Sequence, residues 1–262
     1  GLWSSPSTGK VNGKQLIFFG GGDGFCYAFD AKPVKEGDTS LLKTVWKYDC
    51  NPPEYKMQDG KAIKYPDANG PSEIIATPVF YKNRIYVSIG QDPEHGEGVG
   101  RIVCLDATKS GDITKDKSAL IWENRDIHRT MASVSIDPAS GLLFVNDFSG
   151  FVHCMDAETG KVYWTHDMKA HMWGSTLVAD GKVYVGDEDG DFVVLAVAKQ
   201  KKILSQVNID GKEMDGPNLG SPIYSTPIAA NGVIYVASNT HLWAFSNTGA
   251  ASDEVPKVEL KQ

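Results

Sequence analysis

The sequence lacks the features of two large classes of protein. No apolar run approaches the roughly 18–20 residues needed to cross a bilayer, so a membrane-spanning protein is excluded. Positive charge is not in excess, because 26 Lys and Arg residues face 33 Asp and Glu residues, for a net charge of −7. Nucleic-acid binders usually concentrate Lys and Arg on one face, so nucleic acid is not expected as a partner.

Cysteine is also scarce, with four residues: Cys26, Cys50, Cys104 and Cys154. They form no CxxC motif and no adjacent pair, which excludes a zinc ribbon, a c-type haem attachment and a disulfide scaffold. Cys104 and Cys154 are expected to pack as small hydrophobes, and Cys50 to be the exposed thiol. The chain begins at Gly1 without a leader segment, so we expect any export signal to have been removed or to lie outside this sequence.

A repeat takes up most of the chain. Its glycine-anchored segment recurs five times, with spacings typical of repeat architectures. The copies of this segment are Gly24 to Ala31, Gly100 to Ala107, Gly150 to Ala157, Gly190 to Ala196 and Thr240 to Ser246.

Two further columns accompany the anchor. A small-residue step precedes each copy, at Ser5-Pro6, Thr77-Pro78, Ala132-Ser133, Ser175-Thr176 and Thr226-Pro227. A tryptophan closes each of the first three copies, at Trp46, Trp122 and Trp164, and the fourth copy has Ser205 in its place. With the alternating apolar residues between them, these columns predict four short antiparallel strands in each copy.

These copies predict an all-β fold, a β-propeller of four-stranded antiparallel blades. One blade cannot bury both of its faces, so the copies must stack, and a ring hides all of them. We expect a single domain over residues 1–262. Its predicted parts are blades at 2–49, 73–125, 128–168, 171–210 and 221–247, an insert at 49–72, and a C-terminal tail at 248–262.

The pattern of small residue, Tyr-Val strand, glycine turn, Asp-Ala and Trp is most complete at Asp156-Ala-Glu-Thr-Gly-Lys-Val-Tyr-Trp164. It resembles the repeat of PQQ-type, or quinoprotein-like, propellers over nearly the whole chain. That family includes quinoprotein dehydrogenases and non-catalytic relatives such as the propeller lipoprotein of the bacterial outer-membrane protein assembly machinery. The resemblance implies a periplasmic, cell-envelope or extracellular location.

The family usually has seven or eight blades, and five are counted here. Two interpretations follow. The favoured one is the C-terminal part of a larger ring, completed by N-terminal blades or by another chain. The other is a closed five-bladed ring in which the tail strand 255–260 completes the last blade.

A candidate ligand site lies where each blade begins. Counting back from the small-residue step gives Glu73, His128 and His171 in three successive blades, with Arg129 and Trp173 beside them. We expect these residues around the mouth of the central channel, where they could bind an organic ligand. Glu73, His128 and His171 could also hold a divalent metal, although side chains that simply line a wet channel are the simpler interpretation.

Other residues have alternative roles. The run Asp187, Asp189 and Asp191 resembles a calcium loop, but a solvated acidic turn is the preferred interpretation. Structural roles are expected for two groups, blade-docking tryptophans and turn-forming aspartates: Trp46, Trp122, Trp164, Asp30, Asp106 and Asp156. The inserts 49–72 and 89–100 are long for propeller loops, and they are the expected places for a protein partner if they do more than pack on the rim.

Three functions stay open at this point. The leading hypothesis is a non-catalytic scaffold or protein-interaction module of the bacterial cell envelope. The second is a quinoprotein oxidoreductase or electron-transfer subunit, for which the resemblance implies PQQ, Ca²⁺ and an adjacent disulfide-bonded cysteine pair that this sequence does not have. The third is a carbohydrate- or peptide-binding module.

Overall fold

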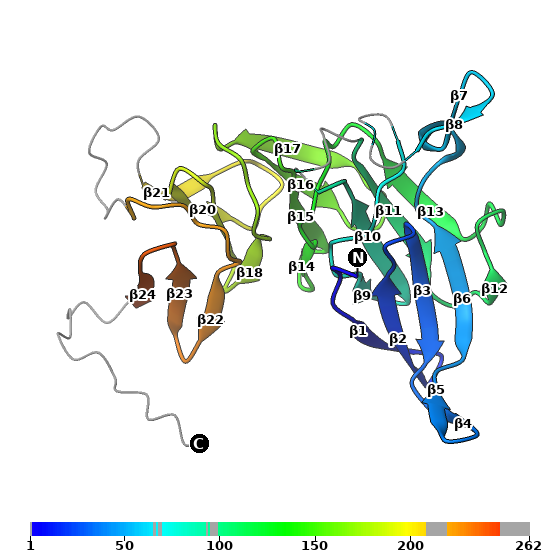
Figure 1. Cartoon of the computed structure of the whole chain (residues 1–262). Helices are drawn as coiled ribbons and strands as arrows, with labels where there is room; N and C mark the ends of the chain where they lie inside the picture. Colours follow the sequence, from blue (N-terminus) through cyan, green and yellow to red (C-terminus); the bar gives the residue numbers. More distant parts are fainter. Residues whose placement is uncertain are drawn as a thin grey trace.

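The computed structural model describes residues 2–64, 67, 70–92, 94, 99–207 and 219–246. They form an all-β fold whose antiparallel sheets follow one another along an arc in sequence order (Figure 1). The predicted propeller architecture with four-stranded blades is therefore confirmed. The predicted tail 248–262 and its strand 255–260 lie outside the described residues.

The first two sheets hold the N-terminal half of the chain. The first sheet contains β1 (Ser7–Val11), β2 (Lys14–Gly20), β3 (Phe25–Asp30), β6 (Thr44–Asp49) and the short β12 (Gly111–Asp112). The second contains β9 (Val79–Tyr81), β10 (Arg84–Ile89), β11 (Arg101–Asp106) and β13 (Leu120–Asn124).

The other three sheets follow in order. The third contains β14 (Ser135–Asp137), β15 (Leu142–Asn146), β16 (Phe151–Asp156) and β17 (Val162–Asp167). The fourth contains β18 (Leu177–Ala179), β19 (Lys182–Gly186), β20 (Phe192–Ala196) and β21 (Ile203–Val207). The fifth contains β22 (Ile228–Ala230), β23 (Val233–Ala237) and β24 (Leu242–Ser246).

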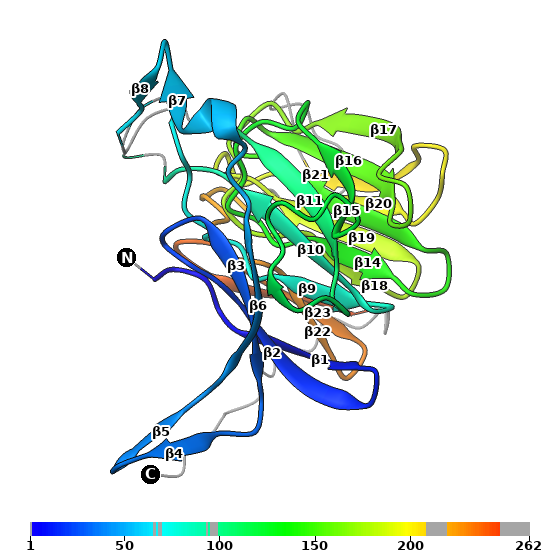
Figure 2. The same ribbon diagram turned by 90° about the vertical axis from the view of Figure 1, so that its right-hand side faces the viewer.

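Two hairpins extend from the first sheet toward opposite ends of the molecule (Figure 2). One is β4 (Val34–Glu36) with β5 (Thr39–Leu41); the other is β7 (Met57–Gln58) with β8 (Lys61–Ala62), after the 3-10 turn η1 (Pro53–Tyr55). Within the described residues, no helix is long and apolar enough to cross a membrane.

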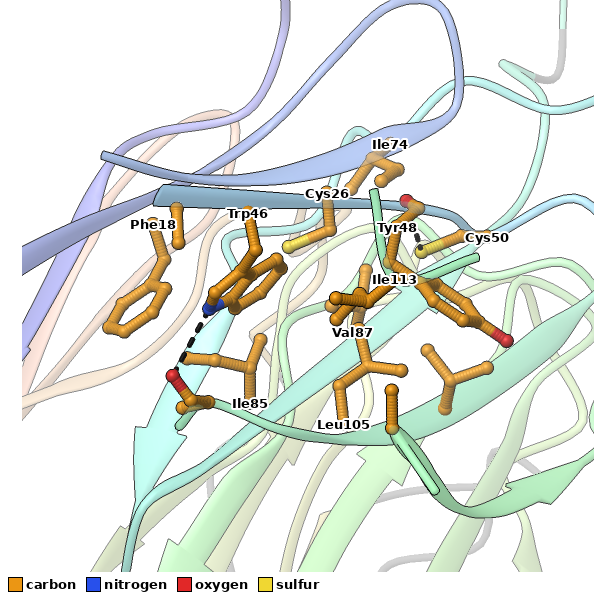
Figure 3. Close-up of a cluster of buried hydrophobic side chains, with 14 of the residues drawn as sticks. Phe18, Cys26, Trp46, Tyr48, Cys50, Ile74, Ile85, Val87, Leu105 and Ile113 are labelled. Carbon is orange, nitrogen blue, oxygen red and sulfur yellow. Dashed lines mark hydrogen bonds between the residues drawn. The ribbon is translucent and has the colours of Figure 1, made fainter. Parts of the chain in front are cut away.

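The core lies between neighbouring sheets. Trp46 is fully buried in the first cluster, beside Phe18, Ile85 and Leu105 (Figure 3). Its indole Nε1 donates a hydrogen bond of 3.1 Å to the carbonyl oxygen of Ala107 in the second sheet's segment.

The next two tryptophans make the same kind of contact. Trp122 Nε1 donates to the carbonyl oxygen of Ala157 at 3.0 Å, and Trp164 Nε1 donates to that of Ala198 at 2.8 Å. Each bond runs from the fourth strand of one sheet to the segment that follows the third strand of the next sheet. A large apolar ring and a directed bond thus join each pair of consecutive sheets.

A second series of bonds runs through the small-residue step. The backbone N–H of Thr77 donates to Ser133 Oγ at 2.8 Å, that of Ser133 to Ser175 Oγ at 2.9 Å, and that of Ser175 to Thr226 Oγ1 at 2.9 Å. At this step, the hydroxyl group of each residue therefore accepts a hydrogen bond from the backbone N–H of the equivalent residue in the preceding repeat.

The aspartates that follow the third strands shape the turns. In the first three sheets an aspartate Oδ1 accepts the backbone N–H two residues ahead, a bond typical of Asx turns. The pairs are Asp30 with Lys32, Asp106 with Thr108, and Asp156 with Glu158.

Cys50 is not the exposed thiol that the sequence suggested. It is fully buried in the first core cluster. Its backbone N–H donates to the carbonyl oxygen of Gly24, and its own carbonyl accepts a bond from Arg101 Nη1 at 2.6 Å. Burial raises the pKa of the Cys50 thiol to about 12. All four cysteines are buried and free.

Candidate functional site

One face of the molecule collects the predicted ligand residues. We call it the crossover face. It is made by the segments that connect one sheet to the next and by the turns between the second and third strands. Backbone hydrogen bonds hold the two sets together, as in Phe148 N to Arg129 O at 2.9 Å and Ile223 N to Asp187 O at 2.8 Å.

Close approach at this face explains the repeat's glycine. At Gly100, a Cβ would lie 2.0 Å from the carbonyl oxygen of His128. At Gly150, where φ is +98°, a Cβ would lie 2.4 Å from the carbonyl oxygen of Ala170. Since no side chain fits between these backbones, the turn requires glycine.

A row of aromatic and cationic side chains crosses this face from the third sheet to the fifth. The Arg129 guanidinium lies 4.4 Å from the centre of the Phe148 ring, and the His171 ring stacks on Phe148 at 4.3 Å. Trp173 meets Phe148 edge-on at 5.0 Å and Tyr224 edge-on at 5.5 Å. We call these five residues the aromatic row.

Hydrogen bonds fix the middle of the aromatic row. His171 Nδ1 lies 2.9 Å from the carbonyl oxygen of Phe148, and Trp173 Nε1 donates to Glu188 Oε2 at 2.8 Å. Phe148 is buried, whereas Trp173 and Tyr224 remain 36% and 46% exposed. Two rigid, amphipathic aromatic side chains are therefore presented to other molecules.

A cavity of about 300 Å³ opens beside the row. Its lining comes from the insert 49–72, the insert 89–100, the segment before the third sheet and the turn between β15 and β16. The lining residues are Tyr55, Val99, Gly100, Arg125, Ile127, His128, Arg129 and Ser149. Its two arginines are Arg125, which is paired with acidic side chains, and Arg129 of the aromatic row.

Ion pairs anchor one wall of the cavity. Arg125 pairs with Glu54 and, through Nε at 3.1 Å, with Glu123. The buried Arg101 donates its Nε to the same Glu123 carboxylate at 2.7 Å. Burial alone would raise the pKa of Glu123, but Arg125 and Arg101 hold it below its usual value. The charged side chains of this wall are therefore held in place by ion pairs with one another.

Two equivalent turns of this face carry a buried aspartate. Asp147 Oδ2 lies 3.0 Å from His153 Nε2. Asp187, in the next sheet, accepts backbone N–H bonds from Asp189 and Asp191 on Oδ1, and no described residue hydrogen-bonds its Oδ2. Burial, assisted by the neighbouring charge of Asp191, raises the pKa of Asp187 to about 7. The expected solvated acidic turn thus has a buried carboxyl at its base.

The structure corrects the register of the third repeat by one residue. The hydroxyl series aligns Ser133, not Ala132, with Thr77 and Ser175. Counting back the same distance from Ser133 gives Arg129, so Arg129 is the equivalent of His171. His128 lies one position away, and it lines the cavity together with Arg129.

The other predicted ligands do not gather into a metal centre. Glu73 is buried, with Oε1 3.4 Å from the backbone N–H of Asp92. Across the described ranges, no group of three or more His, Cys, Asp or Glu side chains could hold a metal ion. This finding covers the set Glu73, His128 and His171 and the set Asp187, Asp189 and Asp191.

Sequence reasoning missed Phe148, Tyr224 and Arg125. Tyr224 could have been found, because it stands two residues before Thr226, just as Trp173 stands two residues before Ser175. The sequence could not have identified Phe148, because an aromatic residue in a turn is not by itself typical of a binding site. Its contact with His171 is seen only in the folded structure.

Comparison with known proteins agrees with this architecture. Residues 111–207 match the PQQ_2 family model, described as outer membrane protein assembly factor BamB. This matched part of the chain is therefore similar to PQQ-type propeller repeats. A search of curated proteins gave no match.

Several solved structures share this all-β propeller fold. BamB from Moraxella catarrhalis is 16% identical with a TM-score of 0.61, over 92% of this chain and 57% of that one. The quinohemoprotein alcohol dehydrogenase ADHIIG from Pseudomonas putida HK5 is 15% identical with a TM-score of 0.57, over 87% and 42%. A europium-containing methanol dehydrogenase is 16% identical with a TM-score of 0.57, over 88% and 51%. The chain thus spans about half the length of these three structures, from 42% to 57%. At these identities the similarity shows the fold alone.

Proposed function

We propose that this chain is a non-catalytic protein-interaction module of the bacterial cell envelope, and that it binds its partner on the crossover face. The observation that carries the proposal is the aromatic row beside a cavity that two arginines line. Exposed Trp and Tyr side chains with a neighbouring Arg are the residue types that dominate protein–protein binding energy.

The match to a family model described as an outer membrane protein assembly factor supports the envelope as the place of action. Both inserts reach the cavity, through Tyr55, Val99 and Gly100, which agrees with a partner that also contacts the inserts. A segment with aromatic and acidic side chains fits best, since its rings would meet Trp173 and Tyr224 while its carboxylates face the cavity.

The quinoprotein alternative is favoured by the dehydrogenases among the structural relatives. The residues present do not fit the quinone site that the resemblance implies. The sequence has no adjacent cysteines, and its four thiols are buried and free, so the disulfide-bonded cysteine pair of that site cannot form. We therefore derive no redox step for this chain.

The test is site-specific photo-crosslinking in cells. We expect a photoreactive phenylalanine at Tyr224 to form a discrete crosslink with an envelope protein, identified by mass spectrometry. The matched control places the same group at Ile121, on β13, which is 38% exposed.

A second change localises the contact. Trp173→Ala should reduce the Tyr224 crosslink by about tenfold, the loss of a typical hot-spot side chain. The proposal would be contradicted by a crosslink yield at Ile121 equal to that at Tyr224. A Tyr224 crosslink yield that Trp173→Ala leaves unchanged would also contradict it.

A further inference from the structure

The fourth sheet lacks the tryptophan that the first three sheets use to contact their neighbours. In each of those sheets the tryptophan faces a small residue just before a bulge in the third strand; the pairs are Trp46 with Ala28, Trp122 with Cys104, and Trp164 with Cys154. The same register and the same bulge pair Ser205 with Val194 in the fourth sheet. Ser205 therefore holds the tryptophan position.

The aromatic partner of the missing indole is still present. In the first three sheets a second-strand ring lies 5.9 Å from the tryptophan, centre to centre; these rings are Phe18, Tyr86 and Phe144. Phe144 pairs with Cys154, and Tyr184 pairs with Val194 in the same way. Tyr184 is thus the equivalent ring in the fourth sheet.

The surface that faces the tryptophan position from the next sheet is also equivalent from repeat to repeat. Trp164 packs in one cluster with Val183 and Leu195, which pair with each other in the fourth sheet. In the fifth sheet, Ile234 and Phe245 form the corresponding pair. The surface that would receive an indole from the fourth sheet is therefore in place.

Between these walls lies a cavity of about 680 Å³, more than twice the volume of the cavity on the crossover face. Its lining includes Tyr184, Phe192, Val194, Ser205, Ile234 and Phe245. Phe192 and Phe245 stack across it at 5.7 Å with an interplanar angle of 12°. This volume and apolar lining are typical of sites for small ligands.

No tryptophan of this chain is left to fill the cavity. Trp46, Trp122 and Trp164 occupy the other sheet boundaries, Trp173 belongs to the aromatic row, and Trp3 is exposed. Trp243 of the fifth sheet packs against the same cluster as Tyr184 and Phe192, but it is not among the residues that line the cavity, and its Nε1 donates to Ser238 Oγ at 3.3 Å. The undescribed segments 208–218 and 247–262 contain no tryptophan in the sequence.

We propose that the cleft between the fourth and fifth sheets is a binding site for a planar fused aromatic ring of the indole type. The ring would take the volume that tryptophan takes at the other boundaries, against Tyr184 on one side and Ile234 and Phe245 on the other. Its source is a free small molecule or a tryptophan side chain of another protein.

The test is ¹⁹F NMR titration of the purified full chain with 5-fluoroindole. We expect saturable binding that Ser205→Trp weakens by about tenfold or more, because the tethered indole then fills the cavity. Ser205→Ala leaves the cavity open and should bind as the wild type does. Ala229→Leu, which narrows the cleft from the fifth sheet, gives a second blocked variant if Ser205→Trp does not fold.

N-acetyltryptophanamide separates the two sources. Binding comparable to that of 5-fluoroindole supports a protein side chain as the occupant, and binding of 5-fluoroindole alone supports a small molecule. Absence of saturable 5-fluoroindole binding, or equal binding by the wild type and folded Ser205→Trp, would overturn the proposal. The site is independent of the crossover face, so Trp173→Ala should leave 5-fluoroindole binding unchanged.

Discussion

Trp46→Ala is expected to lower the free energy of unfolding by about 3–5 kcal/mol, the usual cost of removing a large core aromatic side chain. Trp46 is fully buried between the first two sheets, and its Nε1 bond to Ala107 is lost in the variant, which leaves that carbonyl without its partner. Chemical denaturation followed by circular dichroism measures the change.

Two variants serve as comparisons for Trp46→Ala. Trp46→Phe keeps much of the apolar contact and removes the hydrogen bond, so it should cost less than Trp46→Ala. Trp3 is 62% exposed, and Trp3→Ala should change stability by no more than about 0.5 kcal/mol. If Trp46→Ala cost as little as Trp3→Ala, the tryptophans would not be the residues that join the sheets.

Asp187→Asn is expected to stabilise the protein increasingly as the pH rises. The Asp187 carboxyl titrates near 3.8 when solvated and near 7 in the folded protein, because burial disfavours its charged form. Between these values the native state binds more protons than the unfolded state, so wild-type stability falls as pH rises from about 4 to about 7. Asparagine removes this dependence.

The stability difference between Asp187→Asn and the wild type should therefore widen by about 2–4 kcal/mol between pH 4 and pH 8. Thermal unfolding at four pH values across this range measures it. Asp38, exposed at the tip of the β4–β5 hairpin, provides the control, since Asp38→Asn should show no such widening. A difference that stays constant with pH would mean that Asp187 is ionised in the folded protein without penalty.

The sequence predicted the fold because the repeat combines independent signals. The glycine anchor, the alternating strand and the tryptophan recur together, and each has a physical cause in the structure. Gly150 meets the carbonyl oxygen of Ala170, and Trp164 donates to that of Ala198. A pattern with several causes at fixed spacing is difficult to mistake.

The candidate site was harder to predict, because it depends on contacts between segments far apart in the chain. Ala132 and Ser133 are both small, so the sequence alone could not choose between them, and a one-residue error replaced Arg129 with His128. Cys50 and Asp187 lie in segments with polar neighbours, yet backbone hydrogen bonds across the fold bury both.

Additions to the repeat were also invisible to repeat analysis. β12 pairs in parallel with β6 and brings Ile113 into the first core cluster, although it belongs to the second repeat. The loop that contains β12 crosses from the second repeat to the first sheet. Neither the strand pattern nor the repeat spacing predicts where such a loop packs.

We propose that the crossover face binds a protein and is not a redox centre. The most direct test of this proposal is calorimetric titration of the purified chain with PQQ and Ca²⁺, followed by dye reduction with an alcohol. We predict no saturable heat and no quinone-dependent dye reduction for the purified chain, whereas the variant with the photoreactive phenylalanine at Tyr224 forms its crosslink in cells. Saturable PQQ binding that Trp173→Ala abolishes, together with alcohol-dependent dye reduction, would contradict the account.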